Sequence, residues 1–205
     1  LFRSMLHCTS SFLPAVKDQL LLAAKCGVDV VSSTEELLVP EMQHAQIAKE
    51  IHAAAKQGGI TVLGTGVNPG YAMDFVAIVA SAVTFDVTGV QCTRVVDAGT
   101  RRLPLQKKVG AGLTTAEFEQ QMATGKFGHI GMRESVALLA KALDFKVDKI
   151  EQTVEPVIAA WAWAELPAPS TIARAVLPDP LPRGIMSTVD HLLPGELRRL
   201  RSRSP

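Results

Sequence analysis

Two neighbouring glutamates, Glu35 and Glu36, are the residues of this sequence best suited to acid–base chemistry. They follow Val28–Val31, a β-branched run typical of a buried strand. A carboxylate at the carboxyl end of a strand can accept a proton or stabilise a developing cation. A structural role is also open, because Ser32 and Glu35, or Ser33 and Glu36, have the spacing of a helix capping box. The residues alone favour the structural role and do not choose between the two pairs.

A glycine-rich loop, Gly64–Gly70, follows the apolar run Ile60–Leu63 and precedes apolar residues at helical spacing over Met73–Val83. This order predicts a strand, a ligand-facing loop and a helix, an arrangement that binds anions and polar ligands. The loop is close to the dinucleotide fingerprint, with Asp86 downstream as its acidic residue. However, the third glycine comes one residue late, and Pro69 lacks an N–H that the loop would need. We therefore expect a ligand-facing loop of another kind.

Hydroxyl side chains follow the first predicted strand, Ser4–Thr9, as the cluster Thr9, Ser10 and Ser11. In a parallel sheet, the carboxyl ends of neighbouring strands meet at one edge, where ligands bind. We therefore expect this cluster to lie near the two glutamates and the glycine-rich loop. Its hydroxyls have two possible roles, binding a ligand or capping the following helix, and the two roles are compatible.

Two further groups suit a substrate. His129 lies in a loop between glycines, which bring backbone close to whatever the loop contacts. An exposed loop histidine is the equally weighted alternative. Arg101 and Arg102 form a pair that suits a carboxylate, although a surface pair is more common. The sequence contains no Cys/His metal-ligand spacing, no nucleophile elbow and no Walker loop, so we expect no metal site.

The elements that must position these residues alternate between strand and helix up to about residue 84, which predicts a parallel sheet. The predicted helices of this part are Phe12–Lys25 and Glu41–Gln57. Residues 85–160 have an α+β pattern. It consists of a strand at Val87–Val96, a helix opened by a Thr114–Glu117 capping box, a helix at Arg133–Leu143 and a strand at Ile150–Ile158. We therefore expect an α/β domain at 1–84 and an α+β domain at 85–160.

The composition excludes several classes. The chain has 205 residues, 47% of them hydrophobic, and a net charge of +1, which gives no electrostatic case for nucleic acid. No apolar run approaches the roughly 20 residues of a membrane span. The three cysteines are scattered, which favours a reduced, cytoplasmic compartment. The chain begins at Leu1 without Met, so we expect a fragment whose N-terminus lies upstream.

Residues 161–205 differ from the rest, because they are rich in proline and arginine and lack a core pattern. One interpretation is a basic arm for nucleic acid or acidic lipid. The favoured interpretation is a divergent and largely disordered tail, with disorder expected above all in the last dozen residues.

Five segments together identify a family. The runs VVSSTEEL, ITVLGTGVNPGYAMD, RVVDAGTRRLPLQKKVGAGLT, GHIGMRESVALLAKAL and IEQTVEPVIA resemble 2,4-diaminopentanoate dehydrogenase and the native amine dehydrogenases. These enzymes are in turn similar to the dihydrodipicolinate reductase superfamily. The resemblance covers roughly residues 5–159. It implies the second half of a Rossmann-type parallel sheet, followed by an α+β domain that closes the substrate pocket and mediates dimerisation.

The resemblance also implies an activity, oxidative deamination of an amine or diamino acid with NAD or NADP as the hydride acceptor. The glutamate after VVSST would be catalytic, which favours Glu35 and keeps Glu36 in reserve. Residues expected near the cofactor are Thr9, Ser10, Ser11, Asn68, Pro69 and Gly70. Residues expected near the substrate are Gly66, His129 and Arg133.

Two departures from the family matter: its first β-α-β unit is missing, and the resemblance stops after about Ala159, which leaves the final strands and part of the dimer contact open. The first β-α-β unit, which carries the true dinucleotide loop, is expected to precede residue 1, so a non-catalytic fragment is one alternative. The other is a dihydrodipicolinate reductase-like enzyme acting on a cyclic imine. It ranks lower because its expected H-H-x-x-K segment is absent. Homodimerisation is expected of the full-length enzyme.

Overall fold

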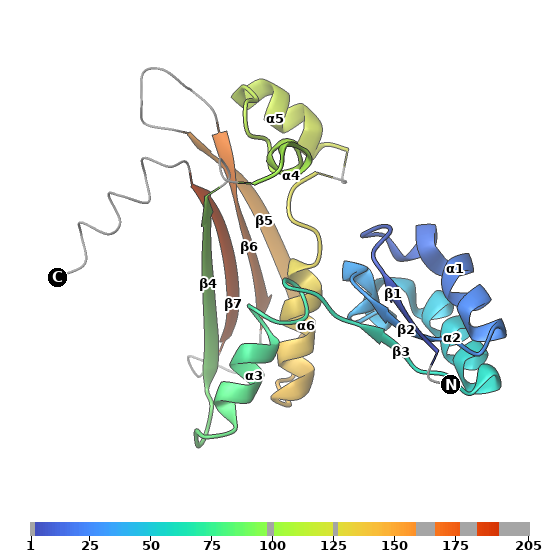
Figure 1. Cartoon of the computed structure of the whole chain (residues 1–205). Helices are drawn as coiled ribbons and strands as arrows, with labels where there is room; N and C mark the ends of the chain where they lie inside the picture. The colour runs from blue at the N-terminus through green and yellow to red at the C-terminus, as the bar shows by residue number, and fades with distance from the viewer. Residues whose placement is uncertain (1–2, 98–100, 125–126, 159–166, 177–183, 193–205) are drawn as a thin grey trace.

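A three-stranded parallel sheet forms the first unit of the chain (Figure 1). Its strands β1 (Ser4–His7), β2 (Asp29–Ser32) and β3 (Val62–Gly64) lie in the order β1-β2-β3. Helices α1 (Leu13–Lys25) and α2 (Glu41–Gly58) connect them, and the 3-10 turn η1 (Glu35–Leu37) follows β2. The computed structural model describes residues 3–97, 101–124, 127–158, 167–176 and 184–192. The expected α/β class with a parallel sheet is confirmed.

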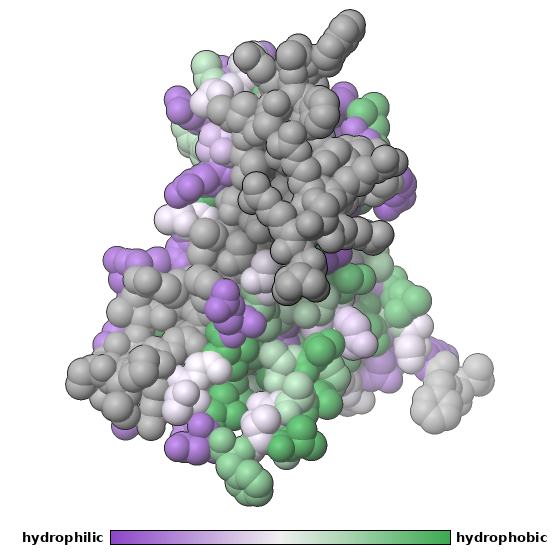
Figure 2. Space-filling model, turned by 90° about the vertical axis from the view of Figure 1, so that its left-hand side faces the viewer, coloured by the Kyte–Doolittle hydropathy of each residue, from purple (hydrophilic) through white to green (hydrophobic). Residues whose placement is uncertain are grey.

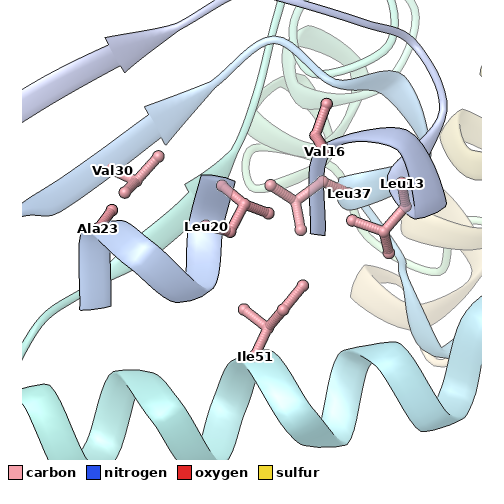
Figure 3. Close-up of a cluster of buried hydrophobic side chains, with 7 residues drawn as sticks. All are labelled: Leu13, Val16, Leu20, Ala23, Val30, Leu37 and Ile51. Carbon is pink, nitrogen blue, oxygen red and sulfur yellow. The ribbon is translucent and has the colours of Figure 1, made fainter. Parts of the chain in front are cut away.

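The core of this unit lies where α1, α2 and η1 meet β2 (Figure 3). Pro14 in the first turn of α1 favours the start of the helix, and Gly27 takes a positive φ of 64° just beyond its end. Between these two residues the apolar side chains recur at helical spacing, so one face of α1 is buried. The buried cluster contains Leu13, Val16, Leu20, Ala23, Val30, Leu37 and Ile51.

A four-stranded sheet of order β4-β7-β6-β5 forms the second unit (Figure 1). Its strands are β4 (Gly89–Asp97), β5 (Lys149–Ile158), β6 (Pro167–Val176) and β7 (Gly184–Leu192). The helices are α3 (Phe75–Ser81), α4 (Leu103–Lys108), α5 (Thr115–Met122) and α6 (Met132–Ala142). α5 begins with the predicted capping box, in which Thr114 and Glu117 bond reciprocally. The core of this unit contains Met73, Met132, Val136, Leu139 and Ala140.

The disorder expected over residues 161–205 is wrong for two of its segments. β6 pairs antiparallel with both β5 and β7, and β7 pairs parallel with β4. The prediction failed because it relied on the density of prolines and arginines, whereas strand pairing depends on partners far away in the sequence. The last dozen residues, 194–205, lie outside the described part of the chain.

The boundary expected at residue 84 also differs from the structure. Met73 is buried in the second core, and Ala77 and Ile78 of α3 pack against that core. The change from one core to the other therefore lies upstream of Met73. Periodicity predicted the helix, but it does not indicate which of two cores a helix faces.

An apolar surface remains on the outer side of α3. Phe75, Val76 and Val79 are each about half exposed, and Val83 is 86% exposed. Figure 2 shows apolar side chains gathered in the lower part of the molecule, at the level of α3 in Figure 1. Within the described residues, no helix is long and apolar enough to cross a membrane.

Replacing Leu20 by alanine is expected to lower the free energy of unfolding by about 2–5 kcal/mol, because Leu20 is fully buried in the first core and alanine leaves a cavity there. Leu22 lies in the same helix but is 61% exposed, so Leu22→Ala should change stability by less than about 0.5 kcal/mol. Urea unfolding of the three proteins measures both effects. Equal losses in the two variants would contradict the packing described for α1.

Candidate functional site

The carboxyl ends of β1, β2 and β3 meet at one edge of the first sheet, as expected from the parallel topology. Backbone hydrogen bonds join the segments that follow them. The amide of Ser33 donates to the carbonyl of His7, and the amide of Thr65 donates to the carbonyl of Ser32. The amide of Glu36 donates to the carbonyl of Ser11. This edge therefore brings the glutamates, the hydroxyl cluster and the glycine-rich loop together.

Glu36 is buried and has a structural role. Its Oε2 accepts a hydrogen bond from the backbone N–H of Leu13 at 2.7 Å and lies 2.9 Å from Nε2 of His44. The N–H of Leu13 belongs to the first turn of α1, where the helix dipole favours a negative charge. Glu36 thus stabilises the N-terminus of a neighbouring helix. Neither predicted capping box forms, since Thr34 is the N-cap of η1 and its side chain makes no capping bond.

Glu35 is in a different environment, on the side of η1 that faces the second unit. Its carboxylate lies 3.7 Å from Nζ of Lys108 at the end of α4, which is a loose ion pair. A Cβ atom placed on Gly131 would lie 3.0 Å from Cβ of Glu35 and would clash with the ring of Pro69. Gly131 therefore allows the second unit to approach both residues closely, and its φ of 97° also favours glycine.

Asn68 links the glycine-rich loop to the loop that precedes α6. Its Nδ2 lies 3.0 Å from Nε2 of His129 and 3.4 Å from the sulfur of Met73. Its Oδ1 is buried and has no hydrogen-bond partner among the described residues. A buried acceptor without a donor is costly in a folded protein, so this oxygen points to a ligand that carries an N–H or O–H group.

Part of the backbone of the glycine-rich loop is already engaged within the fold. The amide of Gly70 donates to Oδ2 of Asp74, and the amide of Ala72 donates to the carbonyl of Val67. A Cβ on Gly66 would lie 2.8 Å from the carbonyl oxygen of Pro69, so this glycine is needed for the fold of the loop itself. These contacts agree with the expectation that Gly64–Gly70 is not a dinucleotide fingerprint.

The hydroxyl cluster after β1 is engaged in local structure. Oγ1 of Thr9 donates to Oε1 of Gln19 at 3.0 Å and lies 2.9 Å from Nε2 of His7. Oγ of Ser10 accepts from the amide of Phe12, the residue before α1. Ser10 thus shapes the turn before α1 but does not cap the helix, whose N-cap is Phe12 and has no side-chain capping bond. The role of these hydroxyls in cofactor binding stays a prediction.

Two buried polar residues near this edge, Asp74 and His7, were missed by sequence reasoning. Asp74 accepts hydrogen bonds from Gly70, Phe75 and Oγ of Ser135, and so ties the glycine-rich loop to α6. His7 bonds to Oγ of Ser32. Asp74 could have been found, because an aspartate before an apolar helical run is a typical N-cap. His7 gave no such signal.

The remaining predicted binding residues lie outside this cluster of contacts. Arg133, in the first turn of α6, is exposed. Arg94 of β4 is half-buried, and burial lowers the pKa of its guanidinium, as does the nearby charge of Arg101. No group of three potential metal ligands occurs in the described part of the chain.

The first comparison concerns the class of fold. The structure superposes on the amine dehydrogenase from Mycobacterium smegmatis with a TM-score of 0.76 and 20% sequence identity, over 94% of this chain and 60% of that chain. It also superposes on biliverdin reductase from Synechocystis sp. PCC 6803, solved with biliverdin and NADP+, with a TM-score of 0.51 and 11% identity. That match covers 94% of this chain and 53% of the reductase. The fold is therefore of an α/β kind found in oxidoreductases.

The sequence comparisons are more specific. Residues 71–165 match the 2,4-diaminopentanoate dehydrogenase C-terminal domain. The chain is 33% identical over 156 residues to 2,4-diaminopentanoate dehydrogenase of Acetoanaerobium sticklandii, a match that covers 75% of this chain and 44% of that enzyme. The resemblance expected from the five sequence segments is confirmed. The chain spans less than half the length of this curated relative.

Replacing Glu36 by leucine is expected to lower the free energy of unfolding by about 1–3 kcal/mol, because the N–H of Leu13 then loses its acceptor. Glu35→Leu is the matched control, since it removes only a loose ion pair and should cost less than about 1 kcal/mol. Thermal or urea unfolding measures both. A larger loss for Glu35→Leu than for Glu36→Leu would contradict the two assignments.

Proposed function

We propose that the protein carrying this chain is an NAD(P)-dependent dehydrogenase that acts on CH–NH2 groups. Its substrate is an amine or diamino acid similar to 2,4-diaminopentanoate, which it deaminates oxidatively. The 33% identity to 2,4-diaminopentanoate dehydrogenase supports this reaction class. The observation that carries the proposal is the difference between the two glutamates. Glu36 is used in structure, whereas Glu35 has its Cβ close to Gly131, which also contacts the ring of Pro69, and its carboxylate makes only a loose ion pair with Lys108.

Glu35 is the proposed base. Removing hydride from the carbon that bears the amine leaves an iminium ion, which water then attacks. The carboxylate accepts the proton that the substrate ammonium must lose and passes it to solvent, and in its ionised form it then stabilises the positive charge that develops on the nitrogen. The nicotinamide, when bound, accepts the hydride.

Asn68 is the residue proposed to bind at the cofactor end of the site. Its buried Oδ1 fits a carboxamide or amine N–H, the kind of donor that a nicotinamide or an amine substrate brings. We propose that Asn68, Pro69 and Gly70 lie between nicotinamide and substrate, with Thr9, Ser10 and Ser11 on the ribose side. Because the amide of Gly70 is already used, the pyrophosphate is not expected on this loop.

Residues of the second unit are proposed to lie at the substrate end of the site. His129 holds the amide of Asn68, and Gly66 shapes the loop in front of it. A carboxylate on the substrate would suit Arg94 and Arg101, two neighbouring cations. Arg133 remains a candidate for the same role, and the choice between NAD and NADP stays open.

Replacing Glu35 by glutamine is expected to lower turnover by about 10³-fold or more while leaving cofactor affinity nearly unchanged, because the charge is lost but size and hydrogen bonding are kept. Glu36→Gln is the control and should keep most of the activity at a cost of about 1 kcal/mol in stability. The measurement is amine-dependent reduction of NAD(P)+ by the protein as its gene encodes it. If Glu35→Gln kept more than a tenth of the turnover and Glu36→Gln lost it, the roles would be exchanged. If both variants kept their turnover, the proposed role of a carboxylate as the base would be wrong.

We also propose that the protein is a cytoplasmic homodimer. The exposed apolar side of α3, with Phe75 and Val79, supports a surface that is covered in the assembled protein. Sedimentation velocity is expected to give twice the monomer mass at micromolar concentration. Val79→Asp should weaken association, because it introduces a charge into this surface, whereas an unchanged dimer would move the interface elsewhere.

A further inference from the structure

Glu134, near the start of α6, is a buried acid for which the proposed reaction has no use. It is 2% exposed, and its Oε1 accepts a hydrogen bond from Nε2 of Gln43 in α2. The two residues are 91 positions apart in the sequence and belong to the two different units. This bond therefore joins the second unit to the segment that follows β2 in the first.

Helix α2, whose Gln43 donates to Glu134, is broken at this contact. His44, the residue after Gln43, has φ of −132° and ψ of 49°, which are not helical values, although it lies inside α2. At this break two consecutive side chains bond to different elements. Gln43 bonds to Glu134 of α6, and His44 bonds to Glu36 of η1 at 2.9 Å. A local break in a helix that persists in a folded protein indicates that surrounding contacts hold it.

The path continues to the proposed catalytic carboxylate. Glu36 is adjacent to Glu35 in η1, and its backbone amide is held by Ser11 at 3.3 Å. Any displacement of His44 or Glu36 therefore moves the turn that carries Glu35. The chain of contacts runs from Glu134 through Gln43, His44 and Glu36 to Glu35.

The charges around Glu134 add a pH-sensitive element to this path. Burial raises the pKa of the Glu134 carboxyl above its ordinary value, and the nearby Glu36 carboxylate raises it further. The backbone N–H of Glu134, the bond from Gln43 and the charge of Arg133 offset part of this rise. The charged groups that act on this acid are thus Glu36 from η1 and Arg133 from α6 itself, and the ring of His44 in α2 bonds to Glu36.

We propose that Glu134 is a positioning residue, which fixes η1 and hence Glu35 through the Gln43–His44 break in α2. This inference rests on the proposed function for its catalytic consequence, but the coupling between α6 and η1 stands without it. Ionised Glu134 would be a buried charge near the Glu36 carboxylate, and the bond from Gln43 offsets only part of this cost. The coupling is therefore expected to loosen as the pH rises from about 4.5, the ordinary value of a glutamate, through the raised pKa.

Amide hydrogen exchange at Leu37 and Leu38, whose N–H groups bond within η1, measures the coupling directly. Glu134→Ala and Gln43→Ala should each speed exchange at these amides by about tenfold or more, since each leaves a polar group without its partner. Glu134→Gln keeps the acceptor, so its exchange rate at these amides should stay within about threefold of the parent protein.

The double variant Gln43→Ala/Glu134→Ala should exchange no faster than the faster single variant, because both substitutions remove the same bond. Gln43 is an exposed residue, so the Gln43→Ala variant should fold. Unchanged exchange in this variant would overturn the proposal even if Glu134→Ala failed to fold.

A second arm separates positioning from general stability. After correction for the intrinsic rate, exchange at Leu37 and Leu38 should rise with pH in the parent protein and stay flat in Glu134→Gln, whose side chain does not titrate. The control is Glu119→Gln, an exposed acid in α5, which should keep the parent profile. A rise of equal size in Glu134→Gln would overturn the role of this acid.

A third experiment measures the effect of the coupling on catalysis. Gln43→Ala should lower kcat with little change in the KM for cofactor, and Glu134→Gln should retain kcat. If Glu35→Gln proved fully active, the proposed function would fail while the exchange results still supported the coupling. If exchange were unaffected and Glu35→Gln inactive, the positioning role alone would fail.

Discussion

The carboxylate of Glu36 is the interaction on which the arrangement of the candidate site depends. It is buried, it accepts the first-turn N–H of α1, and it bonds to the ring of His44 in α2. Three elements, α1, η1 and α2, are thereby tied to one side chain. Because a buried carboxylate must be well bonded to be tolerated, this set of contacts fixes the conformation of η1 and with it the direction of the adjacent Glu35. Two successive residues of one type thus have separate roles, one structural and the other proposed to be catalytic.

The second constraint is the close approach of the two units at Gly131. Only a residue without Cβ fits between Pro69 and Glu35, and the positive φ at this position adds to the requirement. Asn68 and His129, which bond to each other, precede Pro69 by one residue and Gly131 by two residues, respectively. Since the carboxylate, the orphaned amide oxygen and the histidine come from different units, the site exists only when the units are assembled.

Much of the fold could be predicted from local pattern. The spacing of Val16, Leu20 and Ala24 predicts α1, and the Thr114–Glu117 pair predicts the start of α5. What local pattern could not predict are contacts between distant residues. Leu13 and Glu36 are 23 positions apart, and Gln43 and Glu134 are 91 apart. The capping-box spacing of Ser33 and Glu36 left a structural role for Glu36 open, but it could not show that this carboxylate bonds to the first turn of α1. β6 and β7 were missed for the same reason, because their partners lie far along the chain.

The measurement that tests the central claim most directly is a crystal structure of the protein as its gene encodes it, with NAD(P)H and an amine or diamino acid substrate. The substrate nitrogen is predicted to lie within hydrogen-bond distance of the Glu35 carboxylate, with an N–H donor from cofactor or substrate on Oδ1 of Asn68. An amine bound away from Glu35, with Oδ1 of Asn68 still lacking a donor, would contradict the assignment of this site.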